Sequence, residues 1–212
     1  AWDNGLGYAP LSGAAHGAAG IAYALLRLFR LTGDAVYTEA AKEGIAYENE
    51  LFDNTAGNWP DLRYRENTEN EGGRPSFMSG WCSGAPGIGL LRLACLPWAE
   101  ELKGMIQRDV ERALDFTLSH TSAPGDTLCC GNAAMVDFLL TAGRSLDRNE
   151  LVEHARTRAV GILRQKQRTG RFRFTGSEGG IVFNPALFHG SAGIGYTFLR
   201  CCAPEEIVSL LQ

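Results

Sequence analysis

The chain has 212 residues, of which 45% are apolar, and it carries a formal net charge of −4 at pH 7. This length and apolar content suffice for a buried core, and a mildly acidic chain without a basic stripe is not typical of nucleic-acid binding. No stretch is apolar and long enough to cross a bilayer, and no signal-peptide pattern opens the sequence, so we expect no membrane span.

Four glycine-containing turns recur along the chain, and each leads into an apolar run. Their aligned glycines are Gly17, Gly84, Gly131 and Gly190, and the runs that follow are residues 24–28, 90–93, 136–140 and 196–200. A helix that is apolar on nearly every side is usually a buried helix. The repeat therefore predicts four buried helices, each opened by a glycine turn.

Amphipathic segments lie between these turns. Residues 35–51 and 151–166 place apolar side chains at helical spacing with charges between them. Residues 100–118 place a stripe four residues apart, formed by Leu102, Ile106, Val110, Leu114 and Leu118. These segments predict half-buried helices that follow the buried ones.

Alternating buried and half-buried helices predict an all-α fold with an inner ring of helices and an outer ring around it, an α/α toroid. Small residues at the start of each inner helix would let the helices crowd near the axis. An ordinary helical bundle or solenoid with glycine turns is the alternative that the repeat leaves open.

The two residues before each aligned glycine form a column across the repeats. They are Ala15-His16, Cys82-Ser83, Cys129-Cys130 and Phe188-His189. Equivalent positions in a ring of repeats lie at one height along its axis. We therefore expect three cysteines and two histidines to converge at the end where the helix N-termini present their unpaired N–H groups.

Cys82, Cys129 and Cys130 are the predicted ligands of a zinc ion. Thiols near helix N-termini have lowered pKa values, and thiolates bind metals. Three protein ligands with an open fourth position are the count of a catalytic zinc site. His16, in the same column, is the candidate acid or base, and His189 could supply a fourth ligand to a purely structural site. The alternative is three buried structural cysteines.

The other three cysteines, Cys95, Cys201 and Cys202, lie outside the column. We expect Cys95 in the core and the adjacent pair packed near the C-terminus. Six cysteines with two adjacent pairs are few for a disulfide scaffold of this length, which favours reduced thiols and a cytoplasmic protein.

Nearly the whole chain resembles the lanthipeptide cyclase (LanC-like) family, in particular the C-terminal cyclase region of bifunctional class II lanthipeptide synthetases with three cysteine ligands. The segments that carry the resemblance are residues 12–28, 57–63, 80–93, 128–132 and 185–199. The most specific signal is Trp-Cys-x-Gly at residues 81–84 combined with Cys-Cys-Gly at residues 129–131.

The resemblance implies a toroid of seven inner and seven outer helices, of which residues 1–212 would be the C-terminal part, about the last four repeats. It implies zinc on Cys82, Cys129 and Cys130, the last standing where most members have histidine, and an active-site histidine at His16. It also implies a reaction: a peptide thiolate adds to dehydroalanine or dehydrobutyrine and closes a lanthionine or methyllanthionine ring. The implied partners are a precursor peptide, with a leader and a dehydrated core, and an upstream dehydratase domain of the same synthetase.

Three departures from the family pattern stand out. Met78 and Ser79 occupy the region where stand-alone members have a basic residue, and Ser83 stands where Tyr or His is common. The aspartate that the family uses upstream of the His16 position falls before residue 1. A rival interpretation is a non-catalytic module of the same fold that binds zinc, thiols or peptides.

Overall fold

The computed structural model describes residues 2, 5, 9–63, 76–174 and 184–212, and these residues form an all-helical fold. β pairing within them is limited to isolated bridges. The helices follow one another as α1 (Ala18–Thr32), α2 (Ala35–Leu51), α3 (Ala85–Cys95), η2 (Glu100–Leu102), α4 (Lys103–Ser119), α5 (Asn132–Ser145), α6 (Asn149–Thr169) and α7 (Ser191–Cys202). Every predicted helix is present. The segment predicted at 100–118 begins with a short 3-10 helix before α4.

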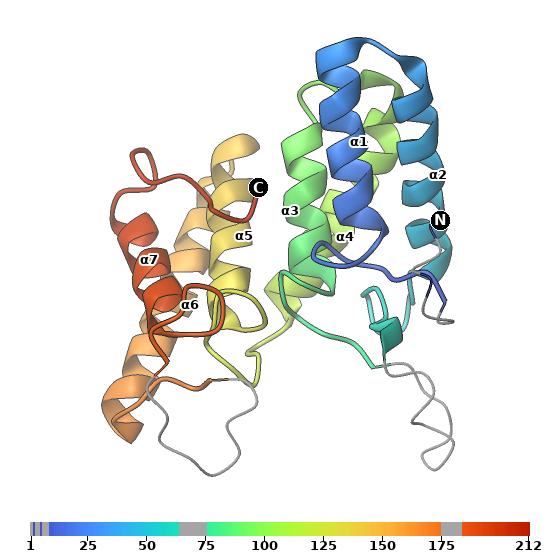
Figure 1. Cartoon of the computed structure of the whole chain (residues 1–212). Helices are drawn as coiled ribbons and strands as arrows, with labels where there is room; N and C mark the ends of the chain where they lie inside the picture. The colour runs from blue at the N-terminus through green and yellow to red at the C-terminus, as the bar shows by residue number, and fades with distance from the viewer. Residues whose placement is uncertain (1, 3–4, 6–8, 64–75, 175–183) are drawn as a thin grey trace, which may run out of the picture.

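Two layers of helices are visible in Figure 1. The odd-numbered helices form a row in which α1 packs on α3, α3 on α5 and α5 on α7. The even-numbered helices cover this row, with α2 against α1, α4 against α3 and α6 against α5. This arrangement confirms the predicted alternation of inner and outer helices, while a closed ring of seven repeats stays a prediction.

Burial is greatest in α3 and α5, the two central helices of the row. All residues of α5 from Asn132 to Gly143 are buried, whereas α4 and α6 bury one face each. A close approach at the centre requires glycine, because a Cβ on Gly89 of α3 would lie 2.5 Å from Phe138 Cζ on α5. α3 and α5 are thus buried on nearly every side, as predicted, because neighbours enclose them. α1 and α7 bury one face each, so for these two helices the prediction of a buried helix is wrong.

A buried ion network joins three helices. Arg92 on α3 lies between Glu48 on α2 and Asp109 on α4, at 2.6 Å and 3.1 Å, and the exposed fraction of each side chain is 2% or less. Burial raises the pKa of Glu48 and of Asp109, although the Arg92 charge opposes both shifts. Such a network is costly to break, because each partner left alone is an uncompensated buried charge.

The last residues of the chain return to the inner layer. Asp137 on α5 forms an ion pair with Arg200 on α7 and accepts a hydrogen bond from Ser209 Oγ. Two residues further on, the carbonyl of the buried Leu211 accepts a hydrogen bond of 3.0 Å from Trp81 Nε1. The C-terminal segment therefore reaches the loop before α3. No helix in the described ranges is long and apolar enough to cross a membrane.

Candidate metal centre

The four aligned glycines are the N-caps of α1, α3, α5 and α7, so the sequence repeat marks the start of each inner helix. At Gly84 the backbone requires glycine twice over. Its φ is +105°, and a Cβ would lie 1.9 Å from the Met78 carbonyl oxygen. Residues other than glycine rarely adopt this backbone conformation. The turn that carries Cys82 thus depends on the glycine two residues later.

Successive turns are joined by equivalent backbone hydrogen bonds. The N–H of Ala15 donates to the Cys82 carbonyl over 3.2 Å, the N–H of Cys82 to the Cys129 carbonyl over 3.3 Å, and the N–H of Cys129 to the Phe188 carbonyl over 2.9 Å. Each of these residues stands two positions before an aligned glycine. We call this series of bonds the ladder. It confirms that the predicted column lies at one end of the helices.

Two further glycines allow the turns to dock this closely. A Cβ on Gly13 would lie 2.7 Å from the Cys82 carbonyl oxygen, and one on Gly80 would lie 2.8 Å from that of Cys129. Real Cβ atoms do not come this close to a backbone oxygen, so a side chain at either position would push the turns apart. The absence of a side chain at Gly13 and Gly80 therefore allows neighbouring turns to pack this closely.

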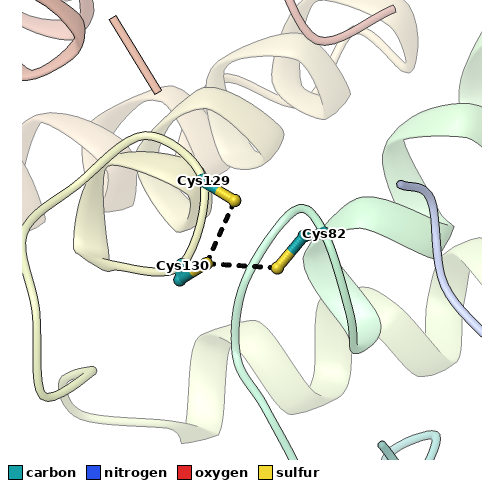
Figure 2. A group of neighbouring side chains, drawn as sticks. All are labelled: Cys82, Cys129 and Cys130. Atoms are coloured by element: carbon teal, nitrogen blue, oxygen red, sulfur yellow. Dashed lines mark hydrogen bonds between the residues drawn. The ribbon is translucent and has the colours of Figure 1, made fainter. Parts of the chain in front are cut away.

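The three cysteine side chains point toward one another from two loops, as Figure 2 shows. Cys130 Sγ lies 3.1 Å from Cys82 Sγ and 3.0 Å from Cys129 Sγ, and all three sulfur atoms lie within 4.8 Å of one another. Thiolates around a tetrahedral zinc ion, with Zn–S bonds of about 2.3 Å, lie about 3.8 Å apart. This value falls within the spread of the sulfurs, so the donor set fits zinc.

The cluster shares protons among its three thiols. Hydrogen bonds from Cys129 and Cys130 lower the pKa of Cys82 to about 3, with smaller help from Arg63 and the Ser83 N–H, while burial opposes the shift. The same contacts, with burial, raise the pKa of Cys129. At Cys130 the hydrogen bond with Cys129 lowers the pKa, but the contact with Cys82 and burial outweigh it and raise the pKa to about 12.

Neither histidine of the column belongs to the cluster of ligand atoms. His16 is exposed, in the turn whose Ala15 N–H bonds to Cys82, and His189 is exposed at the N-terminus of α7. Within the described residues, the group that could hold a metal ion contains the three cysteines and no histidine. A structural zinc site with His189 as fourth ligand therefore finds no support in the geometry.

The remaining cysteines are free and lie away from the cluster. Cys95 is buried as predicted, and burial raises the pKa of its thiol to about 12. Cys201 packs against the core. Cys202, which we predicted to pack, is exposed at the last turn of α7, so that part of the prediction is wrong.

The structure also shows a basic residue near the loop of Cys82 that no sequence motif indicated. Arg63 forms a two-pronged ion pair with Asp61, with Nε 2.9 Å from Oδ1 and one terminal nitrogen 2.7 Å from Oδ2. The same terminal nitrogen lies 3.1 Å from Met78 Sδ, four residues before Cys82. The motif at residues 57–63 contained the pair, but its partner Met78 is distant in sequence.

Comparisons with known proteins identify a family and a similar fold. A family model described as lanthionine synthetase C-like protein matches residues 7–212. No curated protein matches the chain. Among solved structures, nisin cyclase is similar, with a TM-score of 0.62 and 19% identity over 93% of this chain and 47% of that one. The chain thus spans about half the length of that helical toroid, and at this identity the likeness is one of fold.

Proposed function

The chain belongs to the lanthionine synthetase C-like family, and we propose that its three-cysteine cluster serves zinc-dependent formation of thioether rings in a peptide. The reaction adds the sulfur of a peptide cysteine to the β-carbon of dehydroalanine or dehydrobutyrine. The C=C bond becomes a single bond, a new C–S bond forms, and the α-carbon gains a proton. The thiol loses its proton in the same balance, so no oxidant or reductant is required.

The observation that carries this proposal is the cluster itself. Two turns of the repeat bring three thiols together at the starts of inner helices, and no fourth protein ligand joins them within the described residues. Three protein ligands are the number that catalytic zinc sites have, whereas structural sites have four. Zinc, when bound, would be held by Cys82, Cys129 and Cys130 and would lower the pKa of a substrate thiol.

His16 is our proposed proton donor to the α-carbon. An imidazole can both donate and accept a proton, as a general acid that must be reset after each reaction does. Its turn is fixed on both sides of the histidine. Glu48 Oε1 accepts hydrogen bonds of 2.9 Å from the N–H groups of Gly13 and Ala19, and the Ala15 N–H bonds to Cys82. This anchoring supports a defined place for His16 beside the cysteine loop.

We further propose that residues 1–212 are the C-terminal part of a LanC-like cyclase domain within a bifunctional synthetase of the cytoplasm. Its substrate would be a precursor peptide with a leader and a core already dehydrated by an upstream domain of the same protein. The match to about half of nisin cyclase supports the first statement, and family membership supports a peptide substrate.

The test is a thiol count. Dehydrated precursor peptide is incubated with the full-length synthetase and zinc, and the remaining thiols are alkylated and counted by mass spectrometry. We expect thiols to disappear with wild type, and His16→Asn to slow this by roughly 100- to 10,000-fold, as loss of a general acid does. Full zinc occupancy with no loss of thiols would instead identify a non-catalytic binding module.

A further inference from the structure

The turn that carries His16 is held from the outer layer by one carboxylate. Glu48, near the end of α2 and fully buried, accepts hydrogen bonds of 2.9 Å from the N–H groups of Gly13 and Ala19 with the same oxygen, Oε1. These two residues lie on either side of His16 in the chain, at equal separation. Glu48 therefore fixes the backbone both before and after the histidine.

The second oxygen of this carboxylate binds the helix that follows the cysteine loop. Glu48 Oε2 lies 2.6 Å from a terminal nitrogen of Arg92, and both side chains are 2% exposed or less. Arg92 belongs to α3, which begins directly after the turn of Cys82. The histidine turn and the cysteine loop are thus joined twice. The first connection is the ion pair of Glu48 with Arg92. The second is the ladder bond of 3.2 Å from the Ala15 N–H to the Cys82 carbonyl.

A buried charge is more than the start of a helix requires. At α3 the neutral amide of Asn58 accepts from the Ala85 N–H over 2.8 Å, so an uncharged acceptor serves the first turn of that helix. At α1 the acceptor is the carboxylate of Glu48, and burial raises its pKa because the charged form is costly away from water. What the carboxylate supplies in addition is a second acceptor oxygen, which binds Arg92. The connection to α3 therefore explains the buried charge.

The place of the histidine matters for the proposed chemistry. A general acid acts when it lies within hydrogen-bond reach of the atom that takes the proton. In the proposed reaction that atom belongs to the peptide whose sulfur is bound at the cluster, so the His16 turn must keep its distance from the Cys82 loop. A displacement of about 1 Å is enough to slow catalysis about a hundredfold. Because His16 is exposed, its place depends mainly on its turn.

We propose that Glu48, held by Arg92, is a positioning residue of the proposed reaction, which keeps the turn of His16 in place relative to the loop of Cys82. Glu48 is fully buried, so it does not touch the substrate and acts through His16. The inference rests on the proposed function, because it requires His16 to be the proton donor.

The experiment is a double-mutant cycle on the full-length synthetase with zinc, in which cyclisation is followed by the thiol count. Glu48→Met removes both acceptor oxygens and leaves Arg92 paired with Asp109. Glu48→Gln keeps the shape of the side chain but has one acceptor oxygen instead of two. His16→Asn removes the acid, and the double variants Glu48→Met/His16→Asn and Glu48→Gln/His16→Asn complete the cycles.

Asp109→Asn is the matched control. Like Glu48→Gln, it replaces a buried carboxylate on Arg92 by an amide of the same shape, but Asp109 lies on α4 and binds Arg92 rather than the histidine turn. Zinc affinity of each variant is measured by competition with a chromophoric chelator. Thermal unfolding sets an assay temperature at which the variants are folded, and Glu48→Gln decides the question if Glu48→Met does not fold.

We expect Glu48→Met to slow cyclisation about a hundredfold and Glu48→Gln about tenfold, with wild-type zinc affinity, because the acid is displaced and the cysteines are not. In the His16→Asn background the same substitutions should have no further effect, since the residue that Glu48 positions is gone. Asp109→Asn should lower the thermal stability and cyclise at the wild-type rate.

Three results would overturn the inference while leaving the proposed function intact. One is a wild-type rate in every Glu48 variant that folds. Another is a loss that persists in full in the His16→Asn background or that Asp109→Asn shares, which would assign Glu48 a purely structural role. The third is a loss of zinc affinity that parallels the loss of rate. If His16→Asn cyclises as fast as wild type, the assigned role of His16 fails, and the inference fails with it.

Discussion

Two of the polar clusters in this fold, the ion network around Arg92 and the cysteine cluster, are built in opposite ways. In the ion network, Arg92 lies between Glu48 and Asp109, and Arg112 lies 3.9 Å from the second oxygen of Asp109, so two cations face two carboxylates within the protein. In the cysteine cluster, three thiols face one another, and hydrogen bonds between sulfur atoms are the contacts that their side chains make with each other. The first arrangement is complete with protein atoms alone. The second needs a cation from outside the protein once its thiols lose their protons, which is what distinguishes a structural cluster from a site.

The largest effect expected from this contrast is on stability. Arg92→Met should lower the free energy of unfolding by about 3–5 kcal/mol, because Glu48 and Asp109 would remain buried without their partner. Urea unfolding of the metal-free chain measures it. The exposed substitution Arg164→Gln is the control and should change stability by less than about 0.5 kcal/mol. A loss below about 1 kcal/mol for Arg92→Met would mean that the two clusters do not differ as described.

The matching change in the cysteine cluster should leave stability nearly unchanged and remove metal binding. Cys129→Ser keeps the size of the side chain but replaces a soft thiolate ligand, so zinc affinity should fall by about a thousandfold. Cys95→Ser, at a buried cysteine outside the cluster, is the matched variant and should retain wild-type affinity. Isothermal titration with zinc distinguishes the two. Equal affinities would remove Cys129 from the ligand set.

The pH dependence of zinc binding sharpens the comparison further. Cys82 has its pKa lowered to about 3 and is already a thiolate at neutral pH, whereas the pKa values of Cys129 and Cys130 are raised, so both keep their protons in the absence of metal. Zinc must displace these two protons. Its affinity should therefore fall about a hundredfold for each pH unit of acidification between pH 8 and pH 6. The free energy of unfolding of the metal-free chain, measured over the same pH range, serves as the control for the zinc affinities. A slope near zero would show that the ligands are already deprotonated.

The smallest expected effect comes from changing the charge of the centre. Cys130→His should keep zinc but remove one negative charge, which leaves less electron density on a substrate sulfur. We expect cyclisation to slow by a few-fold and the range of ring sizes to narrow, measured by the same thiol count on peptides of different ring length. A variant as fast as wild type would contradict this account of Cys130.

Much of the fold could be predicted because it is written in local patterns. The helices follow from apolar spacing, and the alignment of Gly17, Gly84, Gly131 and Gly190 predicted both the inner helices and the convergence of the cysteines. These features depend on residues close in sequence or on a repeat that maps one turn onto another.

The rest of the site depends on contacts that no local pattern contains. Arg63 contacts Met78, which lies outside the motif that contains Arg63, and no local sequence pattern predicts this contact. The bond from Trp81 to the Leu211 carbonyl joins residues near the middle and the end of the chain. Cys202 was misjudged because adjacent residues at a helix end face different sides, so packing of Cys201 does not extend to its neighbour.

The ladder has a consequence for how such a site can arise and be altered. Each turn of the repeat supplies one residue to the ladder, and the backbone hydrogen bonds between these residues do not depend on their side chains. In a duplicated turn, a single substitution at the ladder position can therefore introduce a metal ligand while the backbone structure stays the same. Cys82 and Cys129 occupy two of the four ladder positions, and Ala15 and Phe188 occupy the outer two. Substitutions at Ala15 and Phe188 are therefore suitable starting points for engineering a second catalytic or binding site on the same scaffold.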